Sequence, residues 1–417
     1  MPSDTTAPPP TTADSADHDR TARRVALLLN IGHAIDHMFL LIFATAVGSI
    51  ASEFGFSNWE DLMPFGVGAF VLFGVGSLPA GRLGDLWGRR RMMLLFFFGI
   101  GASAVVAALA RNAWQLAAAL TVLGAFAAIY HPVGIPMLLQ RARNPGAVIG
   151  VNGLSGNLGI AVAALSTGLM VQWIGWRAAF VLPGLLAIGC GFAFARLCPQ
   201  ETEAPAKRTS KARVSLTPAL LARVLLVMTT ASVTGSLLFN FTTNGNAQLL
   251  NERFRGLIDD PALLGALLAA VYAVASLAQV VVGRLIDRVP LKPLYVGIAL
   301  AQVPLLLLAA YAEGWWLLAL LLAVMIVIFG AIPFTDAMIV RYVDDRIRSR
   351  VAGARLTVSI GVSSLAVWLL GPVVKAWSFG TLFLVMSAIS ACTVAVVLWL
   401  PDEEAAQGRE AQPEAAG

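Results

Sequence analysis

Hydrophobic residues form long runs separated by short polar segments over most of the 417-residue chain. Each run has about 20 residues or more, the length that an α-helix needs to cross the hydrocarbon core of a bilayer. The pattern predicts an all-α integral membrane protein with twelve transmembrane helices. The predicted helices are 25–50, 61–81, 92–110, 114–139, 147–172, 176–197, 219–248, 262–283, 293–311, 315–340, 351–374 and 378–400.

The segments that connect these runs alternate between two compositions. Connections such as GRLGDLWGRRR and RYVDDRIRSR are rich in arginine, whereas FGFSNW, EGWW and KAWSF are rich in aromatic residues. The positive-inside rule places the arginine-rich side in the cytoplasm. We therefore expect a multi-pass protein of the cell (plasma or inner) membrane with both termini cytoplasmic. All but six of the 29 Lys and Arg residues fit this orientation; the six are Arg111, Arg177, Arg253, Arg255, Lys375 and, inside a predicted helix, Arg355.

The longest internal connection divides the chain into two halves. Residues 198–218 are polar and basic and lie between a six-helix half at 25–197 and a second at 219–400. The segment GRLGDLWGRRR after the second helix corresponds to GRLIDRVPLKP after the eighth. A repeat of this kind is typical of transporters that arose by duplication. Residues 1–24 and 401–417 are expected to be cytoplasmic tails, the first of them disordered because it lacks a long hydrophobic run.

Composition supports the membrane assignment and argues against several other classes. Hydrophobic residues make up 58% of the chain and charged residues 13%, against about 25% charged in ordinary soluble proteins. The net charge of +5 does not indicate nucleic-acid binding, because the positive residues gather in membrane-flanking connections. Cys190, Cys198 and Cys392 show no ligand spacing. We expect no cofactor, no resident metal and no enzymatic activity, and a monomer whose partners are the bilayer, protons and a small molecule.

The connection after the second helix resembles the signature loop of the major facilitator superfamily, G-x-x-x-D-R-x-G-R-R, with Leu86 in place of its first arginine. The resemblance implies two six-helix bundles that rock about a central cavity. Glycine lets helix ends approach closely, and an Asp among arginines forms charge-assisted bonds, so we expect a cytoplasmic gate here. A loop that serves topology alone would need only the arginines. The matching residues are Gly81, Asp85, Gly88, Arg89 and Arg90, with Gly283, Asp287 and Arg288 in the second copy.

Within that superfamily, the first half resembles the fosmidomycin-resistance-like branch. The resemblance rests on GHAIDHM in the first helix, IYHPVG in the fourth and SGNLG in the fifth. It implies export of a small organic compound, anionic or drug-like. The chain departs from common proton-driven exporters in two places: the fifth helix lacks G-x-x-x-G-P-x-x-G-G, and the arginine of the fourth helix would fall near Leu120.

Four polar residues of the first helix share one face. Asn30, His33, Asp36 and His37 follow helical spacing, and titratable groups at membrane depth usually face a protein interior or a water-filled path. Histidine titrates near physiological pH, so this face, with His131 of the fourth helix as a partner, predicts a proton relay. Asn30, one turn earlier, is a candidate substrate contact. The alternative is a set of packed histidines bonded to neighbouring carbonyls.

A metal site is a second alternative for the same residues. The H-x-x-D-H pattern formed by His33, Asp36 and His37, with His131 as a third nitrogen, suits a first-row transition ion. Two histidines on one helix face also occur by chance, and no cysteine or methionine cluster joins them. Transition-metal transport is therefore kept as a minor alternative.

Other helices carry further candidate residues. Pro132 beside His131 predicts either a hinge or a static kink in the fourth helix. In the fifth helix, small residues at 150–159 predict close packing, and Asn157 is a candidate substrate contact. In the seventh, Asn240, Asn244 and Gln248 predict either a substrate contact near an outer gate or an interhelical hydrogen-bond seam.

One pair of opposite charges is expected within the membrane of the second half. Asp336 in the tenth helix and Arg355 in the eleventh can pair as a structural lock, or one of them can serve the substrate. Together these observations predict a secondary transporter that works by alternating access, with proton coupling and efflux. Uptake of an organic acid or a similar metabolite is the alternative. A membrane sensor or a polytopic enzyme is disfavoured, since the sequence shows neither a signalling domain nor a complete catalytic set.

Overall fold

A computed structural model describes residues 12–140, 145–200, 217–343 and 345–401. Their regular secondary structure is entirely helical, and twelve helices are long and apolar enough to span a membrane. The predicted fold class is therefore confirmed. The long helices are α1 (Thr12–Glu53), α3 (Val67–Trp87), α4 (Arg89–Ala108), α5 (Ala113–Ala127), α7 (Pro145–Trp173), α8 (Trp176–Leu197), α9 (Pro218–Arg253), α10 (Pro261–Ile286), α11 (Leu291–Tyr311), α12 (Gly314–Tyr342), α13 (Asp345–Ala376) and α14 (Phe379–Val397).

The first helix starts earlier than the sequence indicated. Residues 12–24 belong to α1, so the expectation that all of 1–24 is disordered was wrong for this part. Ala22, Arg23 and Arg24 are good helix formers, and extending an existing helix costs far less than starting one. Residues 1–11, the linker positions 201–216 and the tail 402–417 lie outside the described residues.

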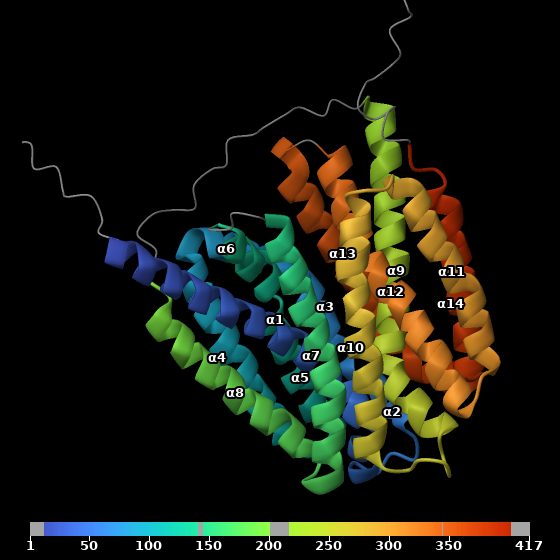
Figure 1. Cartoon of the computed structure of the whole chain (residues 1–417). Coiled ribbons are helices and arrows are strands. Elements are labelled where there is room, and N and C mark those ends of the chain that lie inside the picture. The colour runs from blue at the N-terminus through green and yellow to red at the C-terminus, as the bar shows by residue number, and fades with distance from the viewer. Residues whose placement is uncertain (1–11, 141–144, 201–216, 344, 402–417) are drawn as a thin grey trace, which may run out of the picture.

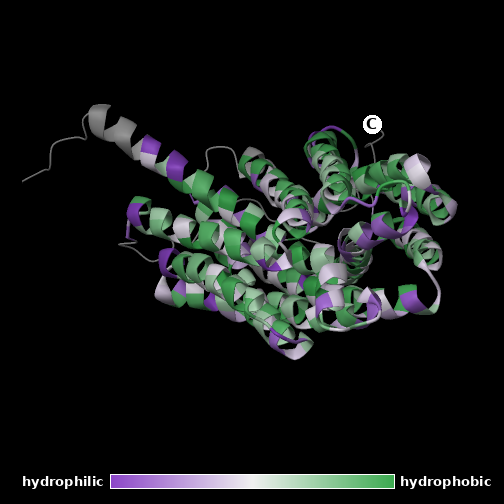
Figure 2. Ribbon diagram, turned by 90° about the horizontal axis from the view of Figure 1, so that it is seen from below, coloured by the Kyte–Doolittle hydropathy of each residue, from purple (hydrophilic) through white to green (hydrophobic). Residues whose placement is uncertain are grey.

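The chain forms two bundles that lie side by side. In Figure 1 the blue and green helices α1, α4, α5, α7 and α8 of the first half lie toward the left, and the yellow-green to red helices of the second half lie toward the right. Most of the ribbon is hydrophobic, with polar segments gathered near helix ends (Figure 2). Large apolar side chains such as Leu78, Leu109 and Phe192 are exposed, as expected for a surface that faces lipid.

The fourth spanning segment is broken in its middle. Between α5 and the short helix α6 (Ile135–Leu139), residues Tyr130–Gly134 form a π-helical turn, η2, that contains Pro132. Proline removes a backbone donor, and π-turns recur at functional sites. The predicted irregularity at Pro132 is therefore present, while its role as a hinge or a static kink stays a prediction.

The two halves meet most closely near one end of the bundle. Short elements α2 (Trp59–Leu62) and η1 (Met63–Gly66) precede α3 at this end and pack against α13. Figure 1 shows α2 at the lower end, opposite the arginine-rich connections. Nearby, α7 and α10 approach closely, because a Cβ atom at Gly168 would lie 2.5 Å from the carbonyl oxygen of Pro261.

Candidate functional site

The histidines of the first and fourth spanning segments lie together inside the first half. The His33 ring centroid lies 4.7 Å from that of His37 on the same helix and 5.1 Å from that of His131 on η2. His33 and Asp36 are buried, whereas His37 and His131 are partly exposed. The structure thus brings the four predicted titratable groups into one cluster, which we call the histidine cluster: His33, Asp36, His37 and His131.

Asp36 is the only acidic member of the cluster and is fully buried. Its Oδ2 atom lies 3.6 Å from Nε2 of His131, and neither carboxylate oxygen accepts a hydrogen bond from the described residues. A buried carboxylate without donors is costly in its charged form. The arrangement therefore favours states in which Asp36 takes up a proton, faces a protonated His131 or contacts another cation.

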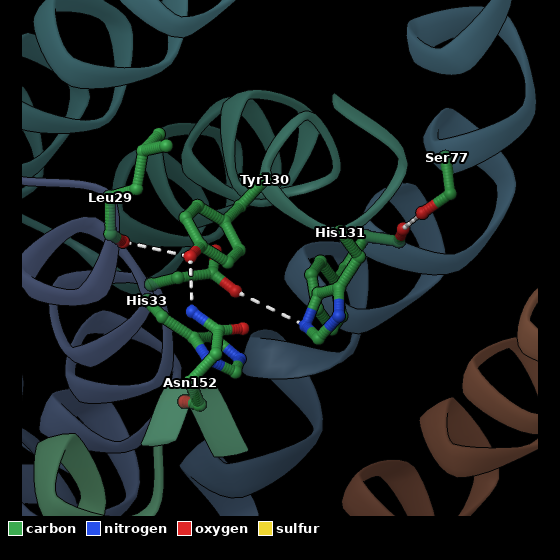
Figure 3. Close-up of polar contacts among 8 residues, drawn as sticks. Leu29, His33, Ser77, Tyr130, His131 and Asn152 are labelled. Atoms are coloured by element: carbon green, nitrogen blue, oxygen red, sulfur yellow. Dashed lines mark hydrogen bonds and ion pairs between the residues drawn. The ribbon is translucent and has the colours of Figure 1, made fainter. Parts of the chain in front are cut away.

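His33 is held firmly in one orientation. Its Nδ1 lies 2.7 Å from the carbonyl oxygen of Asn152 on α7, and its ring stacks on Tyr130 (Figure 3). A carbonyl oxygen can only accept, so Nδ1 carries the proton and Nε2 is left with a lone pair. That Nε2 is buried and has no hydrogen-bond partner in the described part of the chain. Gly156 makes room for the ring, because a Cβ atom there would lie 2.7 Å from it.

A hydrogen-bonded group behind His33 was not singled out from the sequence. The Tyr130 hydroxyl donates to the carbonyl oxygen of Leu29 at 2.7 Å and accepts from the Asn152 side chain at 2.7 Å (Figure 3). The Asn152 side chain also donates to Oδ1 of Asn30 at 2.9 Å. Asn30, predicted to contact substrate, here belongs to this group. The signal that could have revealed it was the amide side chain of Asn152 among the small residues at 150–159.

The polar residues of α9 mostly bond within their own helix. Asn240 donates to the backbone of Ser236, and Asn244 donates to the backbone of Asn240. Gln248 reaches the other half and donates to the carbonyl oxygen of Ala44 on α1 at 3.3 Å. For Gln248 this geometry is that of an interhelical hydrogen-bond seam, the alternative to a substrate contact. Asn244 Oδ1, like Asn157 Nδ2 on α7, is buried without a hydrogen-bond partner.

Asp336 and Arg355 form the ion pair that the sequence suggested. Nη2 of Arg355 lies 2.8 Å from Oδ1 of Asp336, and the guanidinium also donates to the Thr335 hydroxyl. Asp336 is mostly exposed and Arg355 is not, while Nε of Arg355 is buried without a partner. The pair joins α12 to α13 within the second half, and a role toward substrate stays a prediction.

The predicted cytoplasmic gate is not engaged in this structure. Within the described residues, the Asp85 and Asp287 carboxylates are exposed and have no ion-pair partner, in contrast to the expected charge-assisted bonds. Arg90 instead donates to the carbonyl oxygens of Ala195 and Cys198 at the end of α8. The physical reason is that the halves meet at the opposite end. Gly88 forms the turn between α3 and α4 with a positive φ of 91°, which explains the glycine. The gate roles of Gly81, Arg89, Gly283 and Arg288 likewise stay predictions.

Contacts at the opposite end join the halves and were missed from the sequence. Lys375 on α13 pairs with Asp61 on α2, and Trp59 stacks on Phe379 with ring centroids 6.0 Å apart. Gly371 lies against α2, where a Cβ atom would be 2.2 Å from the carbonyl oxygen of Glu60. A pocket of about 320 Å³ lies at this end, lined by residues of the segment 48–59 and by none of the histidine cluster.

The histidine cluster also has the composition of a metal site. One nitrogen from each of His33, His37 and His131 lies within 4.8 Å of the other two. From the sequence, a metal was only a minor alternative, because two histidines on one helix face also occur by chance and no cysteine or methionine cluster joins them. The structure places the third histidine, His131, beside the other two.

Comparison with protein families gives one match that spans nearly the whole chain. The model of the Major Facilitator Superfamily matches residues 29–255 and 255–416. Among solved structures, a bacterial homologue of the human lysosomal transporter Spinster, in an inward-facing and unoccupied conformation, has a TM-score of 0.66 at 14% identity. The match covers 93% of this chain and 95% of that one, so it supports the fold alone.

Several curated proteins are similar at the level of sequence. The multidrug resistance protein MdtG of Serratia proteamaculans (strain 568) is 24% identical over 319 residues, which are 75% of this chain and 76% of that protein. The puromycin resistance protein pur8 of Streptomyces alboniger is 28% identical over 42% of this chain and 34% of its own length. A probable actinorhodin transporter of Streptomyces coelicolor is 30% identical over 28% of this chain and 21% of its own length.

Proposed function

This chain belongs to the major facilitator superfamily, and from that premise we propose that it is a proton-coupled exporter of a small organic compound. It is a multi-pass membrane transporter and not an enzyme. The single observation that carries the coupling proposal is the histidine cluster, in which the carboxylate of Asp36 and the imidazole of His131 face each other inside the membrane. Such groups in a spanning segment usually belong to an ion or proton path.

Export is supported by the names of the similar proteins. Those proteins are described as multidrug resistance, puromycin resistance and probable actinorhodin transport proteins. The motifs GHAIDHM, IYHPVG and SGNLG support placement in the fosmidomycin-resistance-like branch. We propose a monomer in the inner or plasma membrane that moves drug-like or anionic compounds out of the cell.

Under this proposal, the contacts between the halves indicate to which side of the membrane the transporter is open. The positive-inside rule assigns the arginine-rich end, with both chain termini, to the cytoplasm. The end that carries the Asp61–Lys375 pair is then the outer end, and it is closed. The protein is therefore in the state that receives a compound from the cytoplasm, with the cytoplasmic gate of Asp85 and Arg90 released. Reorientation would engage that gate and open the outer end.

The proposed function is tested in everted membrane vesicles that contain the protein. A proton gradient with an acidic vesicle interior is applied, so that protons leave the lumen as the compound enters. Accumulation of puromycin, ethidium and a radiolabelled organic acid is measured with and without an uncoupler. Export of a drug-like compound gives uncoupler-sensitive accumulation of puromycin or ethidium. Proton-driven uptake in right-side-out vesicles, with the organic acid alone transported, would contradict export and support the alternative direction.

A further inference from the structure

We propose that the histidine cluster binds one divalent first-row transition-metal ion of the Zn²⁺ class, through His33 Nε2, one nitrogen each of His37 and His131, and the carboxylate of Asp36. The proposal does not rest on the proposed function, because binding is measured without transport. It rests on which donor atoms are present, how they are oriented and which of them have no other partner.

The donor atoms of this cluster lack the hydrogen bonds that buried polar atoms normally make. Among the residues that the structure describes, His33 Nε2 and both oxygens of Asp36 are buried and find no hydrogen-bond partner. More than nine in ten buried polar groups in native proteins have a partner, so three unpartnered acceptors in one place need an explanation. All three are electron-pair donors, and a cation is the species that satisfies several such atoms at once.

The surroundings of His33 match the usual environment of a metal ligand. A metal-binding histidine typically donates its second ring N–H to a carbonyl or carboxylate, which fixes the ring and its tautomer. His33 does so toward the carbonyl oxygen of Asn152 at 2.7 Å, and its ring stacks on Tyr130 (Figure 3). The lack of a side chain at Gly156 leaves the space that the ring occupies. The free nitrogen of His33 is therefore presented in advance of binding.

The three histidine nitrogens are close enough to share one ion, and the Asp36 carboxylate lies beside one of them. Bonds of about 2.0–2.1 Å in a tetrahedral site place neighbouring donor atoms about 3.4 Å apart. Asp36 Oδ2 and His131 Nε2 are already 3.6 Å apart, and the three histidine nitrogens lie within 4.8 Å of one another. Closing the remaining distance needs side-chain movements of about an ångström, which the π-helical turn that carries His131 can accommodate.

The donor set selects the class of ion. Imidazole suits Zn²⁺, Co²⁺ and other borderline ions, whereas Mg²⁺ and Ca²⁺ need mostly oxygen donors, of which the cluster offers one side chain. Three neutral imidazoles and one carboxylate carry a single negative charge, so a bound divalent ion leaves a net charge of +1. Partial exposure of His37 and His131 provides the route of entry. Protons and the ion use the same lone pairs, so we expect affinity to fall at low pH.

The test uses the purified full-length protein in lipid nanodiscs, with Co²⁺ as the spectroscopic probe and Zn²⁺ as the competitor. Tetrahedral Co²⁺ bound to nitrogen and oxygen gives visible absorption bands that aqueous Co²⁺ lacks. We expect bands that saturate at one Co²⁺ per protein, disappear with one equivalent of Zn²⁺ and persist in excess Mg²⁺. Absence of these bands, together with no Zn²⁺ binding heat in calorimetry, would overturn the proposal.

Variants identify the ligands. His37→Gln, His131→Gln and Asp36→Asn should each weaken Zn²⁺ binding at least 10-fold. His18→Gln is the matched control, because His18 lies fifteen residues before His33, about 22 Å along the helix, and should leave affinity unchanged. Equal loss in the control, or unchanged affinity in all three cluster variants, would contradict the assignment.

A measurement on the wild-type protein tests the site even if the variants fail to fold. Histidines are modified with diethyl pyrocarbonate and located by mass spectrometry, with and without Zn²⁺. We expect Zn²⁺ to lower the modification rate of His37 and His131 several-fold and to leave His18 unchanged; equal rates with and without Zn²⁺ at the cluster histidines would refute the site. Metal binding without proton-driven transport would contradict the proposed function alone, and the reverse result would contradict this inference alone.

Discussion

Nζ of Lys375 lies 2.5 Å and 2.7 Å from the two carboxylate oxygens of Asp61, so a single ion pair joins residues 314 positions apart and connects the two halves of the transporter. Both side chains are 40–48% exposed, and pairs of this kind contribute about 0.2–1 kcal/mol. Such an energy is too small to determine the stability of the fold. It is enough to shift the equilibrium between two conformations whose free energies differ by a similar amount.

Reversing one charge of this pair should loosen the contact between the halves at this end of the bundle. We expect Asp61→Lys or Lys375→Glu to raise deuterium exchange in residues 59–66 by up to about five-fold, which corresponds to a loss of about 1 kcal/mol. The double variant restores the pair and should restore protection. Arg177→Gln is the matched control, because it breaks the Glu53–Arg177 pair within the first half. Equal exchange in all the variants would show that the Asp61–Lys375 pair has no part in closure.

Adding a methyl group at Gly371 should hinder closure without touching the histidine cluster. The new Cβ would lie 2.2 Å from the carbonyl oxygen of Glu60, well inside contact distance, only while α2 and α13 are together. Gly371→Ala should therefore reduce turnover and raise exchange at 59–66. Gly297→Ala on α11 adds the same group where no atom lies within 4 Å, and it should behave as wild type. If both substitutions slow transport equally, a hindered approach of α2 to α13 at Gly371 is not the cause of the slower turnover.

Removing the Tyr130 hydroxyl should weaken the support of His33. Tyr130→Phe deletes the acceptor of an Asn152 side-chain bond and leaves that buried donor with one partner fewer, a change of about 1–3 kcal/mol. We expect a lower unfolding temperature in detergent and weaker metal binding. The elution volume in size-exclusion chromatography should be unchanged. Tyr311→Phe, at an exposed tyrosine of α11, provides the control. Unaltered stability and affinity in Tyr130→Phe would contradict a supporting role.

The local part of the site could be predicted because helical spacing fixes it. His33, Asp36 and His37 share a face of α1 whatever surrounds them, and the twelve spanning helices follow from hydrophobic length. His131 could be named as a partner because it was the other membrane histidine in the first half.

What the sequence did not reveal depends on how helices pack. The bond from His33 to the carbonyl oxygen of Asn152 requires the close approach of α1 and α7 at Gly156, and no local pattern sets that register. Asp61 and Lys375 lie in connecting regions of opposite halves, so only the assembled fold pairs them. The conformation also decides which predicted contacts form. The loop residues Asp85 and Asp287 remain unpaired because this structure is joined at the other end.

Proton flux in proteoliposomes tests the central claim most directly. A pH-sensitive dye inside the vesicles reports proton movement when the compound identified in the vesicle assay is added to wild type, Asp36→Asn or His18→Gln. The account predicts compound-dependent proton flux in wild type and His18→Gln. In Asp36→Asn that flux should fall at least 10-fold, while exchange of labelled for unlabelled compound continues. Undiminished proton flux in a folded, exchange-active Asp36→Asn protein would contradict coupling through the histidine cluster.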